Sequence, residues 1–221
     1  MNSKTSSEVG NRILSRQARL FPLLPQDGLD ALVLNPGPTL SYLTGLSFHL
    51  SERPVVLILA PTDSPVLILP ELEAGKIDTL LFPIRSFAYD EDPDSWPDVF
   101  KQAVRAAHIQ RSTVGVESGR MRFLELSLLQ TASKDIRFEA ADPTLARLRM
   151  QKDPYEIDQM RTAVQIAQKA LQVTLSTIKA GLSEREIAAE LTTQIYRSGS
   201  DSELPFAPIV SAGPNSANPH A

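Results

Sequence analysis

Cysteine is absent from the 221-residue sequence. Without a thiol, the chain has no disulfide, no thiolate zinc site and no cysteine nucleophile. The absence also fits a reducing compartment, where proteins rarely depend on disulfides.

An excess of basic residues is absent as well, because 22 Lys and Arg against 26 Asp and Glu give a net charge of −4. A basic surface for nucleic acid is therefore not predicted. The longest aliphatic run, Val55 to Ala60, is too short to span a bilayer. The opening MNSKTSSEVGNR lacks the apolar segment of a signal peptide. We expect a soluble, cytoplasmic protein with no nucleic-acid partner and no membrane contact.

Complete catalytic motifs are missing too. The sequence has no H-E-x-x-H zinc motif, no G-x-S-x-G nucleophile elbow and no Walker loop. The acidic stretch 90–98 fits a calcium loop only in part, because Ser95 stands where an EF-hand needs glycine and Lys101 where it needs glutamate. We interpret this stretch as a solvated loop between two elements.

Short apolar segments alternate with helical ones through the first part of the chain. Strands are predicted at 29–35, 53–61, 64–70, 84–89, 113–118 and 136–140, and helices at 8–24, 38–45, 71–81, 97–109 and 122–132. The strands at 53–61 and 64–70 are close enough to form a hairpin, and both are continuously apolar, so both of their faces should be covered. The pattern predicts an α/β fold, a mixed sheet flanked by helices.

The character of the sequence changes after about residue 142. A long helix should begin at an N-cap formed by Asp153 with Glu156 and end at Gly181. Ser183 and Glu186 form a second capping box for the next helix.

An apolar stripe recurs along the long helix at three- and four-residue spacing. Its members are Ile157, Met160, Val164, Ala167, Leu171, Leu175 and Ile178. A strand is predicted at 206–211, followed by a loop rich in Gly, Pro and Asn. Two helices, one strand and a loop cannot close a core, so this second domain is expected to be incomplete.

The chain contains three histidines. His108 falls within a predicted helix between apolar neighbours, which favours a structural role. His49 falls in a loop between a helical turn and a strand, where a polar surface residue is the ordinary interpretation and a site residue is the alternative. His220 follows the predicted strand within the terminal loop, and loops on a rigid scaffold often carry chemistry.

Several stretches in order resemble the Xaa-Pro peptidase and creatinase family, metallopeptidases with a "pita-bread" fold. YLTGLSFHLSERPVVLIL (42–59) resembles a segment of its N-terminal domain, and LARLRMQKDPYEIDQMRTAVQIA (145–167) resembles its domain junction. GLSEREIAAEL (181–191) resembles its second catalytic-domain helix, and FAPIVSAGPNSANPHA (206–221) resembles the strand and loop that deliver its first active-site histidine. The resemblance implies a creatinase-like N-terminal domain at 1–145 and the start of a pita-bread α+β domain at 146–221.

The resemblance also implies an activity, hydrolysis of the peptide bond before proline in a proline-containing peptide. It places His220 at the catalytic position that contacts substrate and helps to stabilise the tetrahedral intermediate. Family members use two divalent ions (Mn, Co or Zn), whose Asp, His and Glu ligands follow this histidine. No metal ligand can be assigned in this sequence, and we expect the 221-residue chain to be inactive alone.

Family members are typically homodimers in which the N-terminal domain approaches the partner's active site. This gives His49 and Arg53 an accessory role in substrate binding. The alternative for Arg53 is an ion pair with a nearby acid such as Glu52, or simple exposure to solvent.

Two other functions stay open at this stage. One is a non-catalytic dimerisation or binding module, since an N-terminal α/β domain of this size should fold by itself. A creatinase-type amidinohydrolase would share the fold and differ in reaction. In either case we expect the apolar helix surfaces beyond about residue 150 to favour aggregation or proteolysis.

Overall fold

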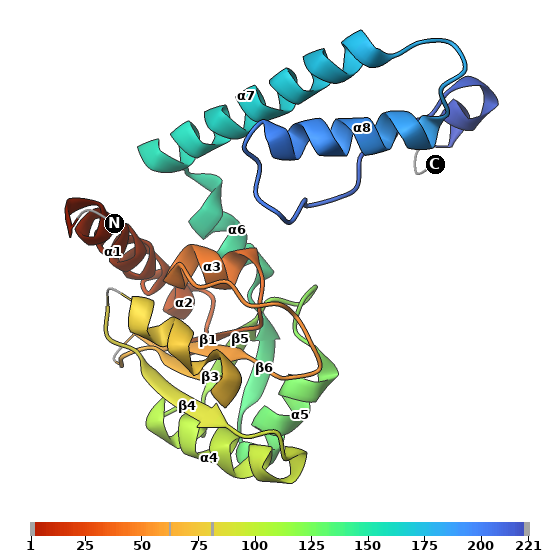
Figure 1. Ribbon diagram of the computed structural model, residues 1–221. Helices are drawn as coiled ribbons and strands as arrows, with labels where there is room; N and C mark the ends of the chain where they lie inside the picture. Colours follow the sequence, from red (N-terminus) through yellow and green to blue (C-terminus); the bar gives the residue numbers. More distant parts are fainter. Residues whose placement is uncertain (1–2, 62, 81, 219–221) are drawn as a thin grey trace. The chain divides into compact units, whose positions relative to one another are not determined.

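The computed structural model describes residues 3–61, 63–80 and 82–218 (Figure 1). It contains two compact units, one extending to Gln151 and the other starting at Lys152. None of the helices in the described part of the chain is long and apolar enough to cross a membrane.

The first unit is built on a six-stranded mixed sheet. Its strands are β1 (Ala31–Leu34), β2 (Val56–Leu59), β3 (Val66–Pro70), β4 (Arg85–Tyr89), β5 (Thr113–Val116) and β6 (Arg137–Ala140). The order across the sheet is β4-β3-β2-β1-β5-β6. Only β2 runs antiparallel to its neighbours, and the other pairs are parallel. The predicted mixed sheet is therefore confirmed.

The predicted hairpin is confirmed as β2 and β3, which pair with Leu57 opposite Leu67. Every residue of both strands is buried. Their side chains alternate between two apolar cores, as the two-residue period of a strand requires. Leu57 and Leu67 enter one core, and Val56 and Ile68 enter the other.

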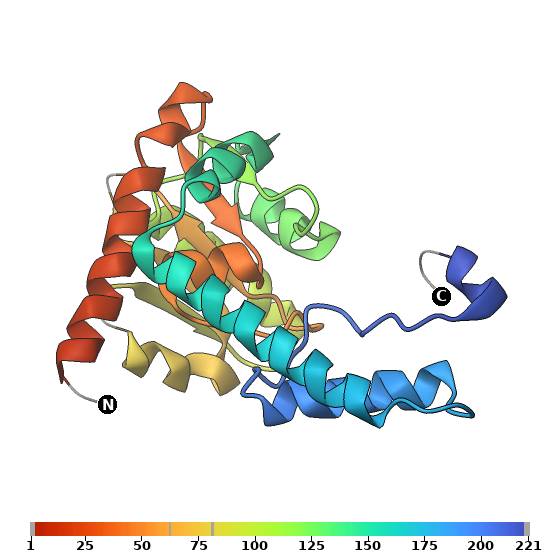
Figure 2. The same cartoon turned by 90° about the horizontal axis from the view of Figure 1, so that it is seen from above.

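Helices cover both faces of this sheet (Figure 2). One face packs against α1 (Ser3–Leu20), α2 (Leu23–Gln26), α3 (Pro38–Thr44) and α6 (Asp142–Met150). The opposite face packs against α4 (Trp96–Ala106) and α5 (Phe123–Ala132). Because the central strands are buried on both faces, a ligand can reach the sheet at the two ends of the strands, where strands meet loops. These two rows of strand ends are called the edges of the sheet.

Two predicted helices differ from the structure in instructive ways. The segment 8–24 is divided between α1 and α2, because Pro22 disfavours helical backbone at the residue before it. The segment 71–81 forms a 3₁₀ helix, η1 (Glu71–Thr79), none of whose residues is buried. Without a buried apolar stripe, little packing holds this segment in α-helical geometry.

The second unit contains α7 (Pro154–Thr177), α8 (Glu184–Arg197) and the 3₁₀ turn η3 (Gly213–Ala217). Both predicted capping boxes are confirmed, with the Glu156 amide 2.8 Å from Asp153 Oδ1 and the Glu186 amide 3.3 Å from Ser183 Oγ. Hydrogen bonds from Ser183 lower the pKa of Glu186. The long helix ends at Thr177, four residues before the Gly181 expected from the sequence.

The predicted apolar stripe of α7 is exposed along its whole length, from Ile157 to Ile178. The strand predicted at 206–211 is wrong, since these residues pair with no other strand in the described part of the unit. A strand needs hydrogen-bonding partners on a neighbouring strand, and no sheet exists beside this segment among the described residues.

Gly115 in β5 should not accept a larger side chain. A Cβ atom there would lie 2.7 Å from Leu29 Cδ1 and 2.8 Å from the Cβ of Ala141. We expect Gly115→Ala to lower the free energy of unfolding by about 1–3 kcal/mol through overpacking. The measurement is denaturant unfolding of the full chain followed by Trp96, its only tryptophan, which packs on Tyr89 in this unit. Gly119→Ala is the matched control, because nothing lies within 4 Å of its added methyl group; an equal loss in both variants would contradict the packing argument.

The contact between Asp27 and helix α6 should stabilise the first unit less as the pH falls. Asp27 accepts hydrogen bonds from Arg147, at 2.5 Å, and from Thr144, and these bonds lower the pKa of Asp27. A lowered folded-state pKa gives stability that is present above the ordinary aspartate pKa and is lost as the pH falls through the folded value. We expect Asp27→Asn to destabilise the unit at pH 7 and to flatten the loss of stability below about pH 4. The measurement is the free energy of unfolding in denaturant at a series of pH values. If the variant and the wild type lost stability in parallel as the pH fell, the role of Asp27 would be ruled out.

Candidate functional site

One edge of the sheet gathers charged residues from distant parts of the chain. The carboxyl ends of the five parallel-running strands lie there, together with the amino end of β2, because β2 runs in the opposite direction. Open α/β sheets bind ligands at the carboxyl ends of their strands. The loop 45–55, which carries His49 and Arg53, enters β2 at this edge.

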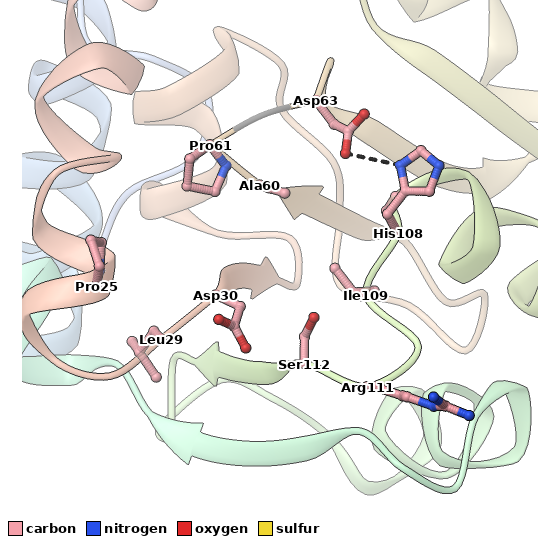
Figure 3. Close-up of a pocket in the computed structure, with 11 residues that line it drawn as sticks. Pro25, Leu29, Asp30, Ala60, Pro61, Asp63, His108, Ile109, Arg111 and Ser112 are labelled. Atoms are coloured by element: carbon pink, nitrogen blue, oxygen red, sulfur yellow. Dashed lines mark hydrogen bonds and ion pairs between the residues drawn. The ribbon is translucent and has the colours of Figure 1, made fainter.

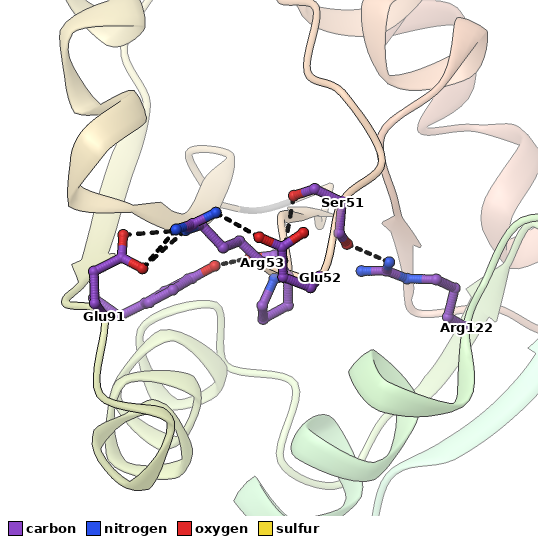
Figure 4. Close-up of polar contacts among 7 residues, drawn as sticks. Ser51, Glu52, Arg53, Glu91 and Arg122 are labelled. Atoms are coloured by element: carbon purple, nitrogen blue, oxygen red, sulfur yellow. Dashed lines mark hydrogen bonds and ion pairs between the residues drawn. The ribbon is translucent and has the colours of Figure 1, made fainter.

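Arg53 is held by two carboxylates (Figure 4). Its Nε lies 3.0 Å from both carboxylate oxygens of Glu91, its Nη2 lies 2.8 Å from Glu91 Oε2, and its Nη1 lies 2.6 Å from Glu52 Oε1. Hydrogen bonds and charge from Glu91, and then the charge of Glu52, raise the pKa of Arg53. The ion pair with Glu52 that the sequence offered as the alternative is present, and Glu91 is a second partner that the sequence did not reveal.

This charge cluster has a simple chemical consequence. Two carboxylates around one guanidinium leave one excess negative charge, which attracts a cationic group such as the amino terminus of a peptide. The bonds to these carboxylates use the Nε–H and one N–H of each Nη atom, so each Nη atom keeps a second N–H donor. The side chain of Arg53 is 34% exposed, so it is accessible to solvent.

The other side of the loop is anchored by Arg122 at the start of α5. Its Nη1 donates to the carbonyl oxygen of Ser51, and its Nε lies 3.0 Å from both oxygens of Glu125. The Glu125 side chain is 0% exposed, so the guanidinium fork neutralises a fully buried charge while it holds the loop. A third anchor is Tyr89, whose hydroxyl donates to the carbonyl of Pro54 at 2.9 Å, and burial raises the pKa of Tyr89.

His49 is exposed and lies just before the residues that these anchors hold in the sequence. Before it, Phe48 is buried, and Lys76 Nζ donates to the carbonyl of Ser47 at 2.9 Å. His49 itself is exposed, with no hydrogen bond or ion pair to any other described residue. The arrangement fixes the backbone on both sides of His49 and leaves its imidazole accessible.

His220 lies outside the described residues, so its predicted catalytic position stays a prediction. The loop that leads to it is described as far as Asn218. Glu184 accepts a hydrogen bond from the Ala212 amide at 2.6 Å and another from the Asn215 side-chain amide at 2.8 Å. Glu184 was not predicted from the sequence. A signal for it exists, because the first turn of α8 holds two acids and the capping box uses only Glu186, which leaves Glu184 free to bond elsewhere.

A metal centre does not form among the described residues, where no three His, Asp or Glu side chains converge. The acidic stretch 90–98 satisfies itself instead: Asp90 Oδ1 accepts from the Asp92 amide at 3.0 Å and from Ser95 Oγ at 2.7 Å. The residues described here therefore do not fit the two divalent ions that the family resemblance implies.

A cleft of about 470 Å³ lies at the opposite edge of the sheet, and His108 and Asp63 are among the residues that line it (Figure 3).

The structure corrects the position of His108, which was expected inside a helix. It follows the end of α4 with a left-handed φ of 54°, and its ring is 69% exposed, with Nδ1 3.0 Å from Asp63 Oδ2. This backbone conformation ends α4 in a helix-capping motif, in which the amide of the buried Ile109 donates to the carbonyl oxygen of Val104.

Comparison with known proteins gives two family matches. Residues 16–151 match the model described as the Creatinase/Prolidase N-terminal domain, and residues 158–221 match Metallopeptidase family M24. The chain is 27% identical over 191 residues to the Xaa-Pro dipeptidase of Lactobacillus helveticus, a match that covers 86% of this chain and 51% of the relative.

Solved structures agree with this. The chain is similar to the dipeptidase of Pyrococcus horikoshii OT3 with a TM-score of 0.81 and 26% identity, over 93% of this chain and 55% of that one. It is similar to a prolidase from Thermococcus sibiricus with a TM-score of 0.79 and 25% identity, over 100% of this chain and 57% of that one. The chain thus spans about half the length of these relatives, which are peptidases. The expected creatinase-like fold is confirmed.

The buried and exposed anchors of the loop 45–55 should differ in their contribution to stability. Arg122→Ala leaves the Glu125 charge buried and unpaired, so we expect the free energy of unfolding to fall by about 3 kcal/mol, measured by Trp96 fluorescence in denaturant. Arg53→Ala removes only exposed ion pairs, and its unfolding midpoint should stay near that of the wild type. If the two variants unfolded at the same midpoint, the anchoring role of the buried pair would be wrong.

Proposed function

Because the chain belongs to the Creatinase/Prolidase N-terminal domain family, we propose that it is the amino-terminal part of a peptidase that hydrolyses the bond before proline. The observation that carries this proposal is the order of the matches. A match to the Creatinase/Prolidase N-terminal domain over residues 16–151 is followed by a match to Metallopeptidase family M24 over residues 158–221, and the relatives that cover most of the chain include an Xaa-Pro dipeptidase.

In this proposal the first unit, which lies outside the catalytic domain, helps to hold the proline-containing peptide. The loop 45–55 supplies two features for that role, an accessible imidazole at His49 and an acidic pair around Arg53. In a homodimer of such peptidases, the loop of one subunit would approach the substrate of the other. The excess negative charge beside Arg53 suits the free amino terminus of a dipeptide better than its carboxylate.

The second unit contributes His220. We assign it contact with the scissile carbonyl and stabilisation of the oxyanion that forms during hydrolysis, a role that its place within the M24 match supports. The family name implies a metal that activates water. The described residues do not form such a centre, so we propose that its ligands lie in the portion of the relatives that this chain does not span, and that the 221-residue chain is inactive alone.

The test is an assay of the polypeptide encoded by the whole open reading frame that contains these 221 codons. We expect it to hydrolyse Xaa-Pro dipeptides in the presence of Mn²⁺ and to spare Xaa-Ala dipeptides of the same first residue. His220→Ala should reduce kcat about 100- to 1000-fold, the usual cost of removing one group that stabilises an oxyanion. The 221-residue chain, assayed in parallel, should show no turnover.

Three outcomes would contradict the proposal. Turnover by the 221-residue chain itself would show that it does not depend on further residues. Hydrolysis of creatine without hydrolysis of Xaa-Pro dipeptides would favour an amidinohydrolase. A reading frame without either activity, whose product forms a stable dimer in sedimentation, would favour a non-catalytic dimerisation module.

A further inference from the structure

The first turn of α8 carries two acids with different partners. Glu186 is engaged by its own N-cap, since the Ser183 amide lies 2.8 Å and Ser183 Oγ 2.7 Å from Glu186 Oε2. Glu184 is the first residue of the helix, and its two oxygens point to partners far along the chain. Oε1 accepts from the Ala212 amide, 28 residues away, and Oε2 accepts from the Asn215 side chain, 31 residues away.

These two bonds hold the terminal loop at separate points. Ala212 lies directly before the turn η3, and Asn215 lies within it. The turn is closed internally by Ser216 Oγ, which lies 2.6 Å from the Gly213 carbonyl, and by the Asn218 amide, which lies 3.0 Å from the Asn215 carbonyl. Fixing Ala212 and Asn215 therefore fixes the turn as one body against the start of α8.

The charge on Glu184 suits this role. It lies at the amino end of a 14-residue helix, where the helix dipole favours a negative charge. Hydrogen bonds to a charged acceptor are about twice as strong as neutral ones. The loop residues 209–218 carry no titratable side chain of their own, so Glu184 supplies the charge in its two hydrogen bonds to the loop.

We propose that Glu184 is the positioning residue that holds the loop 212–218, the segment that leads to His220 in the sequence. This inference rests on the proposed function for its catalytic consequence. The bond from Glu184 to the loop does not, so the two can be tested apart. Glu184 acts through the loop and is not itself placed in contact with substrate.

The first experiment measures the bond in the 221-residue chain. We expect Glu184→Ala to accelerate hydrogen exchange of the Ala212 amide about tenfold, as the loss of one charge-assisted hydrogen bond predicts. The amides of α8 should keep their protection, and Glu184→Gln, which retains one acceptor oxygen, should fall between. Glu190→Ala is the matched control, because Glu190 lies on the same helix and, among the described residues, its side chain bonds only to Gln194 of that helix. Unchanged exchange at Ala212 in Glu184→Ala would overturn the proposal.

The second experiment measures turnover in the product of the whole reading frame. A loop that is displaced from its position should lower kcat about tenfold or more with little change in KM, because the oriented group acts in the transition state. Glu190→Ala should match the wild type. A normal kcat in Glu184→Ala, together with fast exchange at Ala212, would refute the positioning role. A wild-type product without turnover would instead refute the proposed function, and the exchange result would still decide whether Glu184 holds the loop.

Discussion

Burial of the sheet on both faces is the constraint on which the rest of the first unit depends. β1, β2 and β3 have no exposed residue, so each face needs a layer of helices, and the alternating side chains feed two separate cores. The charged residues that hold the loop 45–55 gather at one edge, where strands end in loops. Among them Glu125 is fully buried, and its charge is matched by Arg122 in a forked hydrogen-bonded geometry.

The direction of one strand decides which residues meet at the functional edge. Because β2 runs against its neighbours, the loop 45–55 enters the sheet where β4 and β5 end. Glu91 after β4 then reaches Arg53 across 38 residues of sequence, and Arg122 after β5 reaches Ser51 across 71. These contacts fix the loop after His49, and the bond from Lys76 to the Ser47 carbonyl fixes it before His49. A loop of this length without such anchors would sample many conformations and lose entropy on binding a peptide.

Local signals in the sequence predicted much of this structure. The hairpin and both capping boxes were found because their signals lie within a few residues: apolar runs around a turn, or an acid three positions after an N-cap. The failures are of two kinds. His108 and the 71–81 segment were misassigned because backbone choice there depends on packing, and the 206–211 strand because a strand requires a partner. Glu91, Arg122 and Glu184 were missed because their partners are distant in sequence, and only the fold brings them together. The roles of His49, Arg53 and His220 stay predictions.

The proposed function and the proposed role of Glu184 meet at the terminal loop, which Glu184 holds and which leads to His220. Both are tested together by a crystal structure of the whole reading-frame product with a non-hydrolysable Xaa-Pro dipeptide analogue. We expect His220 within hydrogen-bonding distance, about 3 Å, of the oxygen that replaces the scissile carbonyl, with Glu184 bonded to Ala212 and Asn215. An analogue bound with His220 turned away from it, or with the loop detached from Glu184, would contradict these roles.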